Sequence, residues 1–373
     1  MEKKYRYFET LAHYFPVIGG KETAVHNLSL ALKKRGHEVK ILTSDMDRLG
    51  KRVEGENEYD GIGVKRFFSW LKLGPTAIFF PGIFTYLLEN DYDVVIANTY
   101  RQPQTDLSLF ASKLKGRKCI LATHYPMMPR KGFNKLFINL YDNTVSYLTL
   151  RFYDAIFVLS EDMIPFLLSR GVKKDRIKIV PNGVDDVFFT AKMNRNQNLE
   201  KKERKIILNV ATLNRIKGQE LLLNAIPNMK NQDAEFWLVG PLEDSSKEII
   251  EKAKGFPNVK IMGPKKKEEL LQIYAQADIF VLPSKFEPFG IVALEAMAAG
   301  LPVVATKHGG TKNFVKKPFG LIIDPYDAKE LANALDFFLE NPYTSDEGYE
   351  KAKDYTWDNL ARAVEEYTKD LLK

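Results

Sequence analysis

Short apolar runs rich in Val, Ile and Leu alternate with amphipathic helical segments along most of this chain, and this alternation constrains its fold most. Runs of this kind are typical of parallel strands that are buried on both faces. They form two groups, the first at residues 39–43, 94–97, 119–122 and 155–158, and the second at 206–210, 235–239, 259–262, 279–282 and 303–305. The pattern predicts two doubly wound α/β domains.

The length of the chain also indicates two domains. At 373 residues it exceeds the size at which a single hydrophobic core keeps growing. A polar stretch rich in Asn and Lys separates the two groups of strands and is the expected linker. We therefore predict an N-terminal domain at 1–190, a linker at 191–205, a C-terminal domain at 206–345, and a helical segment at 346–373 that packs back on the N-terminal domain.

Two glutamates eight positions apart, Glu287 and Glu295, flank a predicted turn from a loop into a helix. Gly290 favours the turn, and the apolar, alanine-rich residues 291–299 predict a helix that Gly300 ends. Free N–H groups in the first turn of such a helix attract a phosphate, and carboxylates accept hydrogen bonds from sugar or ribose hydroxyls. This one segment can therefore hold both ends of a nucleotide sugar.

The spacing of these glutamates resembles the E-x7-E signature of the retaining, nucleotide-sugar-dependent glycosyltransferases of family 4, which have the GT-B fold. Two glutamates at this spacing arise often by chance, but further segments resemble the family's other motifs in the family's order. These are the N-terminal glycine loop, the turn after the first helix, the interdomain segment, the x-x-K-G loop and the strand before the acids, at residues 14–22, 35–39, 180–185, 213–218 and 281–284.

The resemblance implies two Rossmann-like domains that face each other across a cleft. It also implies transfer of a hexose from a nucleoside diphosphate sugar to a lipid-linked, glycan or small-molecule acceptor. The transfer would take place on one face of the sugar, with the leaving diphosphate helping to accept the proton of the acceptor and with no covalent sugar–enzyme intermediate. Catalysis would then depend on positioning and on stabilising the leaving group.

Roles for individual residues follow from the same resemblance. Lys217 would place an ammonium on the diphosphate, Glu287 would hold sugar hydroxyls, and Glu295 would hold the ribose. His124, which follows the strand at 119–122, stands where the family has a histidine that contacts the donor. His124, Lys217 and Glu287 are thus the candidate catalytic residues. The candidate nucleotide-sugar contacts are Gly19, Gly20, Arg215, Lys217, Met262, Phe289, Gly290, Ile291 and Glu295.

Each of these residues also has a structural interpretation. A glycine pair before a helix can simply form a turn, a lysine can be solvated, and a loop histidine can be satisfied by local hydrogen bonds. The chain also departs from the family pattern, with Thr212 where an arginine is usual and Asn313 where a glutamate is common. These departures leave open a non-catalytic sugar-nucleotide-binding protein, or an epimerase or phosphorylase of similar architecture.

We expect no metal and no cofactor. The sequence Asp91-Tyr92-Asp93 matches the metal-binding pattern of glycosyltransferases of the other main fold. It precedes the strand at 94–97, at the edge of the sheet opposite the expected ligand edge, so we interpret it as a turn. Lys217 and helix N-termini would neutralise the diphosphate instead.

Charge and composition bear on location and on partners. The net charge is +7, and no acid occurs within residues 61–88 or 107–141, which contain many aromatic and basic residues. Such segments suit an anionic membrane surface, but they equally suit a core flanked by solvated lysines. The basic residues of the second segment are Lys113, Lys115, Arg117, Lys118, Arg130, Lys131 and Lys135.

Other classes are disfavoured. No nucleic-acid-binding module is recognisable. Cys119 is the only cysteine, as is typical of a protein in a reducing compartment. The longest apolar run, residues 73–88, contains two prolines and is shorter than the ~20 residues that a spanning helix needs. We therefore expect a cytoplasmic protein without a signal peptide, either free or peripheral at the inner face of the membrane.

Overall fold

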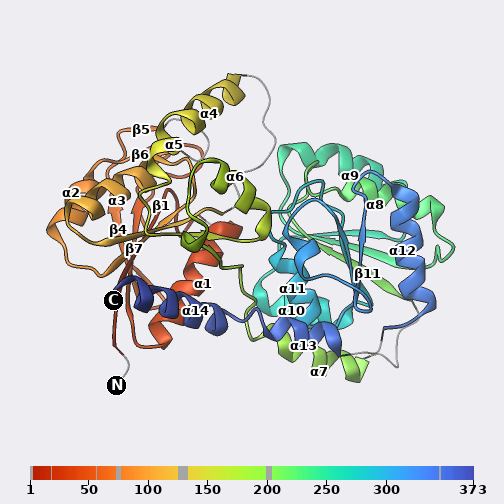
Figure 1. Ribbon diagram of the computed structural model, residues 1–373. Coiled ribbons are helices and arrows are strands. Elements are labelled where there is room, and N and C mark those ends of the chain that lie inside the picture. The colour runs from red at the N-terminus through yellow and green to blue at the C-terminus, as the bar shows by residue number, and fades with distance from the viewer. Residues whose placement is uncertain are drawn as a thin grey trace. The chain divides into compact units, whose positions relative to one another are not determined.

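The computed structural model describes residues 3–17, 19–55, 57–72, 77–124, 133–198, 204–343 and 346–373. The chain divides into two compact units (Figure 1). The first comprises Met1–Asn182 and Trp357–Lys373, and the second comprises Gly183–Thr356. Each unit has its own sheet with helices packed against it, so the predicted fold class of two Rossmann-like α/β units is confirmed.

The first unit is built on an eight-stranded sheet with the strand order β10-β9-β8-β7-β1-β2-β4-β3. Neighbouring strands are parallel except for β3 and β4. The strands are β1 (Arg6–Leu11), β2 (Glu38–Ser44), β3 (Glu58–Tyr59), β4 (Ile62–Phe67), β7 (Val94–Asn98), β8 (Lys118–Ala122), β9 (Ala155–Val158) and β10 (Ile177–Ile179). A separate hairpin consists of β5 (Leu71–Lys72) and β6 (Ile78–Phe79).

Hydrophobic side chains cover both faces of this sheet, because successive residues of a strand point to opposite sides. Phe8 and Val95 belong to the core on one face, and Tyr7 and Ile96 belong to the core on the other. The second of these cores includes Ala361 from α14, the C-terminal helix. The helices are α1 (Gly20–Lys34), α2 (Gly82–Glu89), α3 (Pro103–Leu114), α4 (Phe133–Asn143), α5 (Val145–Thr149), α6 (Ile164–Ser169) and α14 (Trp357–Leu371).

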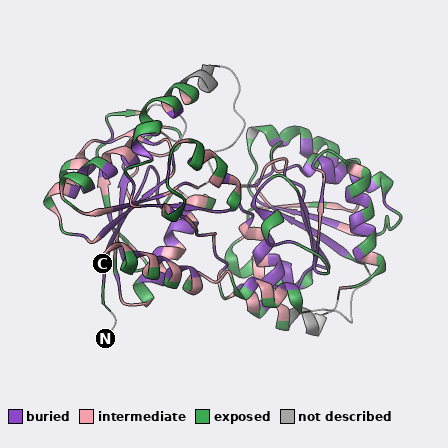
Figure 2. Cartoon of the chain, viewed as in Figure 1, coloured by how far each residue is buried: buried purple, intermediate pink, exposed green. Residues whose placement is uncertain are grey.

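The second unit has a six-stranded, fully parallel sheet with the order β13-β12-β11-β14-β15-β16. The strands are β11 (Ile206–Val210), β12 (Glu235–Val239), β13 (Val259–Gly263), β14 (Ile279–Leu282), β15 (Val303–Thr306) and β16 (Gly320–Ile323). The helices are α7 (Phe188–Asn198), α8 (Gln219–Ala225), α9 (Lys247–Ala253), α10 (Lys267–Gln276), α11 (Ile291–Ala298), α12 (Ala328–Glu340) and α13 (Glu347–Lys353). Figure 2 shows the strands of both sheets buried and the outer sides of most helices exposed.

The predicted strands are all present. The helix predicted after Gly290 is α11. The strands that were not predicted are β1, β3, β4, β5, β6, β10 and β16. In β1 the apolar pattern is broken by Glu9 and Thr10, both of which are buried.

The domain boundaries differ from the predicted ones. The first unit ends at Asn182, and helix α7 occupies most of the stretch predicted to be a linker. Phe188 and Ala191 of α7 are buried, and this helix packs on α10 and α11. At the other end, α13 belongs to the second unit, and only α14 packs on α1 in the first.

The structure also bears on membrane insertion and on the environment of Cys119. Among the helices that the structure describes, none combines the length and the apolar character needed to cross a bilayer. Cys119 is a free, buried thiol in the core of the first unit.

Candidate active site

The loop from β11 to α8 places Lys217 beside Glu287. Gly218 ends the loop with φ +73°, and a Cβ atom there would lie 1.9 Å from the carbonyl oxygen of Pro283. The Asn214 side chain accepts hydrogen bonds from the backbone N–H groups of Ile216 and Lys217, at 3.0 and 2.9 Å. Only glycine permits this approach of two loops, and the fixed loop holds the Lys217 Nζ 2.8 Å from the Glu287 Oε2.

Glu287 lies in the loop after β14 and is held by its backbone as well as by its side chain. Its N–H donates to the His308 carbonyl, and its own carbonyl accepts from the N–H of Gly310, both at 3.0 Å. A Cβ atom on Gly309, which has φ +137°, would lie 1.8 Å from the Glu287 carbonyl oxygen. The side chain is buried, with Ser284 Oγ 3.3 Å from Oε2. The Lys217 ammonium therefore compensates a carboxylate that is largely removed from water.

Helix α11 begins directly after this loop. Its N-cap residue, Gly290, has φ +91°, and no side chain caps the helix. Gly290 has no side chain with which to cap the first N–H groups of α11, which carry the partial positive charge of a helix N-terminus. Phe289 packs its ring on Phe314 at a centroid distance of 5.2 Å, so only the backbone of Phe289 is placed to contact a ligand.

Glu295 lies on α11, where its carboxylate accepts a hydrogen bond from the Tyr274 hydroxyl at 2.8 Å. Burial raises the pKa of Glu295 to about 7, and the bond from Tyr274 and the nearby Lys267 oppose that rise. Tyr274 was not predicted as a site residue. The sequence shows a tyrosine on the helix before β14, but it does not show that this helix packs beside α11, so the bond to Glu295 could not be predicted.

The other residues predicted for the second unit are less directly engaged. Arg215 forms an exposed ion pair with Glu248 of α9, with Nη2 2.5 Å from Oε1. Met262 lies near the carboxyl end of β13 and is partly buried. Asn313 donates its side-chain N–H to the Gly310 carbonyl at 3.0 Å, so it supports the glycine loop next to Glu287. The structure thus brings Lys217 and Glu287 into contact, while Arg215 has a different partner.

In the first unit, Gly19 and Gly20 start helix α1, as the resemblance implied. A Cβ atom on Gly19 would lie 2.2 Å from a guanidinium nitrogen of Arg48. Arg48 pairs with the buried Glu22 at 2.9 Å, and no side chain caps α1. Burial lowers the pKa of Lys21. Lys21 and Arg48 lie 3.8 and 2.9 Å from the Glu22 carboxylate, so two cations and one anion gather at the start of α1.

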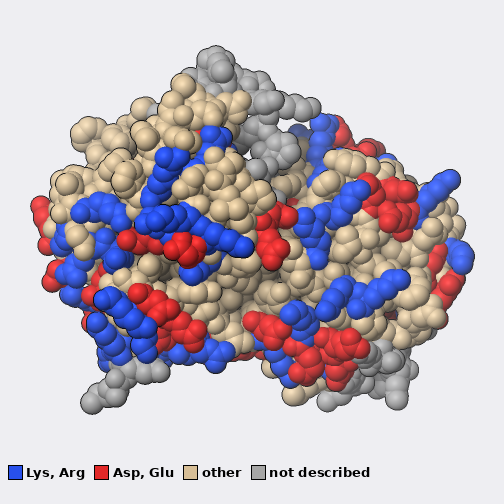
Figure 3. Space-filling model, viewed as in Figure 1, with Lys and Arg blue, Asp and Glu red and all other residues tan. Residues whose placement is uncertain are grey.

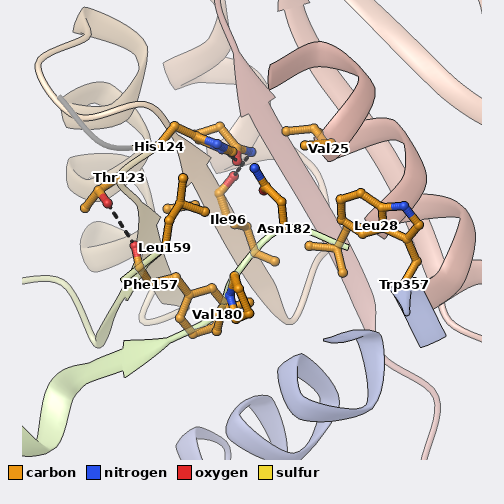
Figure 4. Close-up of a pocket in the computed structure, with 14 residues that line it drawn as sticks. Val25, Leu28, Ile96, Thr123, His124, Phe157, Leu159, Val180, Asn182 and Trp357 are labelled. Carbon is orange, nitrogen blue, oxygen red and sulfur yellow. Dashed lines mark hydrogen bonds between the residues drawn. The ribbon is translucent and has the colours of Figure 1, made fainter. Parts of the chain in front are cut away.

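His124 follows β8 with φ +48°, and its Nε2 lies 2.7 Å from the Oδ1 of Asn98. Burial, followed by the charge of Lys21, lowers the pKa of His124 to about 3, so the imidazole is neutral. His124 lies at the polar end of a cavity of about 40 Å³, which Val25 and Leu28 of α1 line on one side (Figure 4). Asn98 was not predicted as a site residue, although it directly follows the strand predicted at 94–97, at the expected ligand edge.

Asp91 and Asp93 lie before β7, as predicted. The Asp93 side chain accepts from the Arg6 N–H at 2.8 Å, and Asp91 lies 3.7 Å from the Arg6 guanidinium and 3.5 Å from that of Arg117. These contacts give both acids a structural role. Across the described ranges, no group of three or more His, Cys, Asp or Glu side chains is arranged to hold a metal ion. Residues 125–132, which follow His124 and include the basic residues Arg130 and Lys131, lie outside the described residues.

Known proteins resemble both units. Mannosylfructose-phosphate synthase of Agrobacterium fabrum is 32% identical over 218 residues, which is 52% of this chain and 48% of that protein. A subunit of the phosphatidylinositol N-acetylglucosaminyltransferase of Saccharomyces cerevisiae is 24% identical over 373 residues, covering 95% of this chain and 81% of that protein. The chain spans about half the length of most of the curated relatives it matches.

Solved structures share the fold over the whole chain. The structure of HepE from Anabaena in complex with UDP-glucose has a TM-score of 0.76 at 20% identity, over 98% of this chain and 100% of that one. The model for glycosyl transferases group 1 matches residues 191–362, and the model for glycosyltransferase family 4 matches residues 18–188. These two matches run almost end to end, and the chain therefore belongs to the group 1, family 4 glycosyltransferases of the GT-B fold.

Proposed function

We propose that this chain transfers a hexose from a nucleoside diphosphate sugar to an acceptor hydroxyl with retention of the anomeric configuration. The observation that carries the proposal is the contact between Lys217 and Glu287 beside the uncapped start of α11. A diphosphate needs cationic and N–H groups, while the adjoining sugar needs a carboxylate that accepts hydrogen bonds from its hydroxyls. Both kinds of group are adjacent here, at the carboxyl edge of a parallel sheet, where such folds bind ligands.

Lys217 and the N-terminus of α11 would stabilise the negative charge that develops on the leaving diphosphate. Glu287 would hold sugar hydroxyls and so fix the orientation of the sugar. Its side chain already bonds to Lys217 and lies near Ser284, which favours a positioning role over that of a nucleophile. The front-face route implied by the family needs no nucleophilic carboxylate.

The pairing of Lys217 with Glu287 also prepares both groups for a donor. Neither charge is left uncompensated in a site that is mostly removed from water. A bound diphosphate can replace Glu287 as the partner of Lys217, while sugar hydroxyls replace Lys217 as partners of Glu287. The remaining roles proposed are ribose binding by Glu295, phosphate binding by the α1 start at Gly19 and Gly20, and sugar contact by His124.

UDP-glucose is the first donor to test, because the related fold of HepE has been solved with UDP-glucose bound. In a thermal-shift screen of nucleoside diphosphate sugars, a ligand at a hundred times its Kd adds about 2.7 kcal/mol to the stability of the native state. We expect at least one nucleotide sugar to raise the Tm of the wild type. The shift should shrink in Lys217→Ala and remain in Lys230→Ala, which removes an exposed lysine paired with Glu340 in the same unit. Equal shifts in both variants would remove the role of Lys217.

The acceptor is proposed from the surface of the first unit. Phe68 and Trp70 are 67% and 69% exposed, and the guanidinium of Arg52 lies 4.1 Å from the centre of the Phe68 ring. Leu148 and Phe152 are also largely exposed. Figure 3 shows Lys and Arg side chains gathered near α5 and α6. Apolar and cationic side chains together suit an anionic lipid surface, which supports a lipid-linked acceptor, as does the name of the yeast relative.

A further inference from the structure

Glu9 is a buried carboxyl that the fold does not explain. It is 1% exposed in the middle of β1, where it faces Ile41 of β2 and Ile96 of β7 in the register of the sheet. Its Oε2 accepts one hydrogen bond from Asn98, and its Oε1 has no partner among the described residues. Burying a carboxyl in this way is unfavourable, and an apolar side chain of similar size would satisfy the core at lower cost.

The contacts of Asn98 fix the orientation of its amide. Asn98 Nδ2 donates to the Glu9 Oε2 at 2.6 Å and to the Ile96 carbonyl at 3.2 Å. A flipped amide would place its oxygen against the Ile96 carbonyl oxygen, so the two acceptors leave a single favourable orientation. The Oδ1 of Asn98 must then face away from Glu9.

That orientation determines the tautomer of His124. Asn98 Oδ1 can only accept a hydrogen bond, and it lies 2.7 Å from the His124 Nε2, so Nε2 carries the proton. Because the ring is neutral, Nδ1 carries a lone pair and no proton.

We propose that Glu9 and Asn98 form a hydrogen-bond relay that holds His124 as its Nε2–H tautomer, so that Nδ1 accepts a hydrogen bond from a hydroxyl of the bound sugar. Glu9 acts through Asn98 and is a positioning residue. The role of Nδ1 rests on the proposed function, whereas the tautomer depends only on the three side chains.

The chemistry of Nδ1 selects the kind of group that His124 binds. A neutral acceptor nitrogen attracts a hydroxyl and repels a phosphate oxygen, since both the nitrogen and the oxygen present lone pairs. The nearby Lys21, whose charge contributes to the low pKa of His124, has the opposite preference. His124 therefore recognises the sugar, and the cationic start of α1 is left for phosphate.

Nitrogen-15 NMR of protein labelled at histidine tests the relay directly. In the wild type, His124 should show a protonated, pyrrole-type Nε2 and an unprotonated, pyridine-type Nδ1, with the signals assigned by their loss in His124→Asn. Glu9→Leu removes the shorter of the two hydrogen bonds that orient the Asn98 amide and leaves only the longer one to the Ile96 carbonyl, so the His124 signals should move towards a mixture of tautomers. Glu9→Gln keeps an oxygen that can accept from Asn98, so it should restore the wild-type pattern.

Thr10→Val is the matched control. It removes a buried polar group from the same strand, one that contacts Ser108 and not Asn98, so it should leave the His124 signals unchanged. If Glu9→Leu does not fold, Asn98→Ala removes the relay at its second member and should give the same mixture. A pure Nε2–H signal in Glu9→Leu or in Asn98→Ala, or an Nδ1–H signal in the wild type, would overturn the proposal.

Kinetics then separate this inference from the proposed function. Because only the Nε2–H tautomer can accept the hydrogen bond from the sugar, kcat/KM in Glu9→Leu should fall in proportion to the loss of that tautomer, about twofold for an equal mixture, with recovery in Glu9→Gln. An unchanged kcat/KM in a Glu9→Leu variant whose tautomer has shifted would contradict the role of Nδ1. A wild type that consumes no nucleotide sugar would contradict the proposed function and, with it, the role of Nδ1, while the NMR result would still decide the relay.

Discussion

The buried carboxyl of Glu9 should make the stability of the first unit depend on pH, and Glu9→Gln should remove that dependence. Burial raises the pKa of Glu9 in the folded chain to about 8, against an ordinary value of 4.5. Well below pH 4.5 the carboxyl is protonated in both the folded and the unfolded chain, so its ionisation does not change the free energy of unfolding there. As the pH rises from 4.5 to about 8, the unfolded chain ionises while the folded chain does not, so the free energy of unfolding falls.

The size of the effect follows from the two pKa values. Each pH unit between them corresponds to about 1.4 kcal/mol, so the whole interval amounts to about 5 kcal/mol. This is a large fraction of the ~5–15 kcal/mol that stabilises a typical domain. The glutamine variant does not titrate, so its stability relative to the wild type should rise across this pH window and then level off.

Hydrogen–deuterium exchange of peptides from β1 and β7 reports on this unit separately from the other. The ratio of protection in Glu9→Gln to protection in the wild type should increase by about three orders of magnitude between pH 4.5 and pH 8.5. Glu38→Gln is the control, since Glu38 is an exposed glutamate at the start of β2. A ratio that stays constant with pH in Glu9→Gln, or that rises equally in Glu38→Gln, would refute the reasoning.

Further predictions test the proposed ribose contact, the loop that carries Lys217, and the exposed aromatic surface of the first unit. Glu295→Ala should weaken nucleotide binding by about 1–3 kcal/mol in calorimetry. Tyr274→Phe should weaken nucleotide binding more at pH 7 than at pH 9, because losing the hydrogen bond from Tyr274 raises the pKa of Glu295 above 7. Equal nucleotide affinities in the wild type and both variants at both pH values would remove the ribose-binding role of Glu295. Gly218→Ala should lower both Tm and donor affinity, because the added Cβ meets the Pro283 carbonyl. The control Gly263→Ala is also at positive φ but has open space around its Cβ, so it should lower Tm less and keep donor affinity. The reverse order would contradict the loop geometry. Anionic vesicles should sediment the protein at low salt and release it near 1 M salt, where the screening length is about 3 Å. Trp70→Ala should bind the vesicles more weakly than the control Phe337→Ala, which alters an exposed ring of the second unit. A wild type that does not bind such vesicles would favour a soluble acceptor.

Local patterns in the sequence were sufficient to predict much of the fold. The run at 279–282 is entirely apolar and the run at 206–210 is interrupted only by Asn209; their short length and their Ile and Val content favour buried strands over helices. Gly218 and Gly290 do adopt the positive φ values that mark the starts of helices after ligand loops. The contact between Lys217 and Glu287 was foreseeable in outline, because both follow strands whose carboxyl ends meet at one edge of the sheet.

Contacts between distant side chains could not be predicted in this way. The bonds from Tyr274 to Glu295 and from Arg215 to Glu248 depend on how α10 packs beside α11 and how α9 lies beside the β11 loop. Glu9 was missed because a carboxyl in the middle of a short run argues against a buried strand. Helix α7 was missed because its Asn-rich and Lys-rich composition outweighed its few apolar residues.

The most direct test of the central claim is to follow the sugar released from a nucleoside diphosphate glucose by proton NMR, with water as the acceptor. The glucose of UDP-glucose is linked in the α configuration, so a retaining transferase should first release α-glucose, before it equilibrates with the β form. We predict this outcome for the wild type with at least one nucleotide sugar of a panel, and a much slower release in Glu287→Gln. Initial release of β-glucose would contradict the retaining mechanism, and binding without any consumption of donor would contradict the assignment as an enzyme.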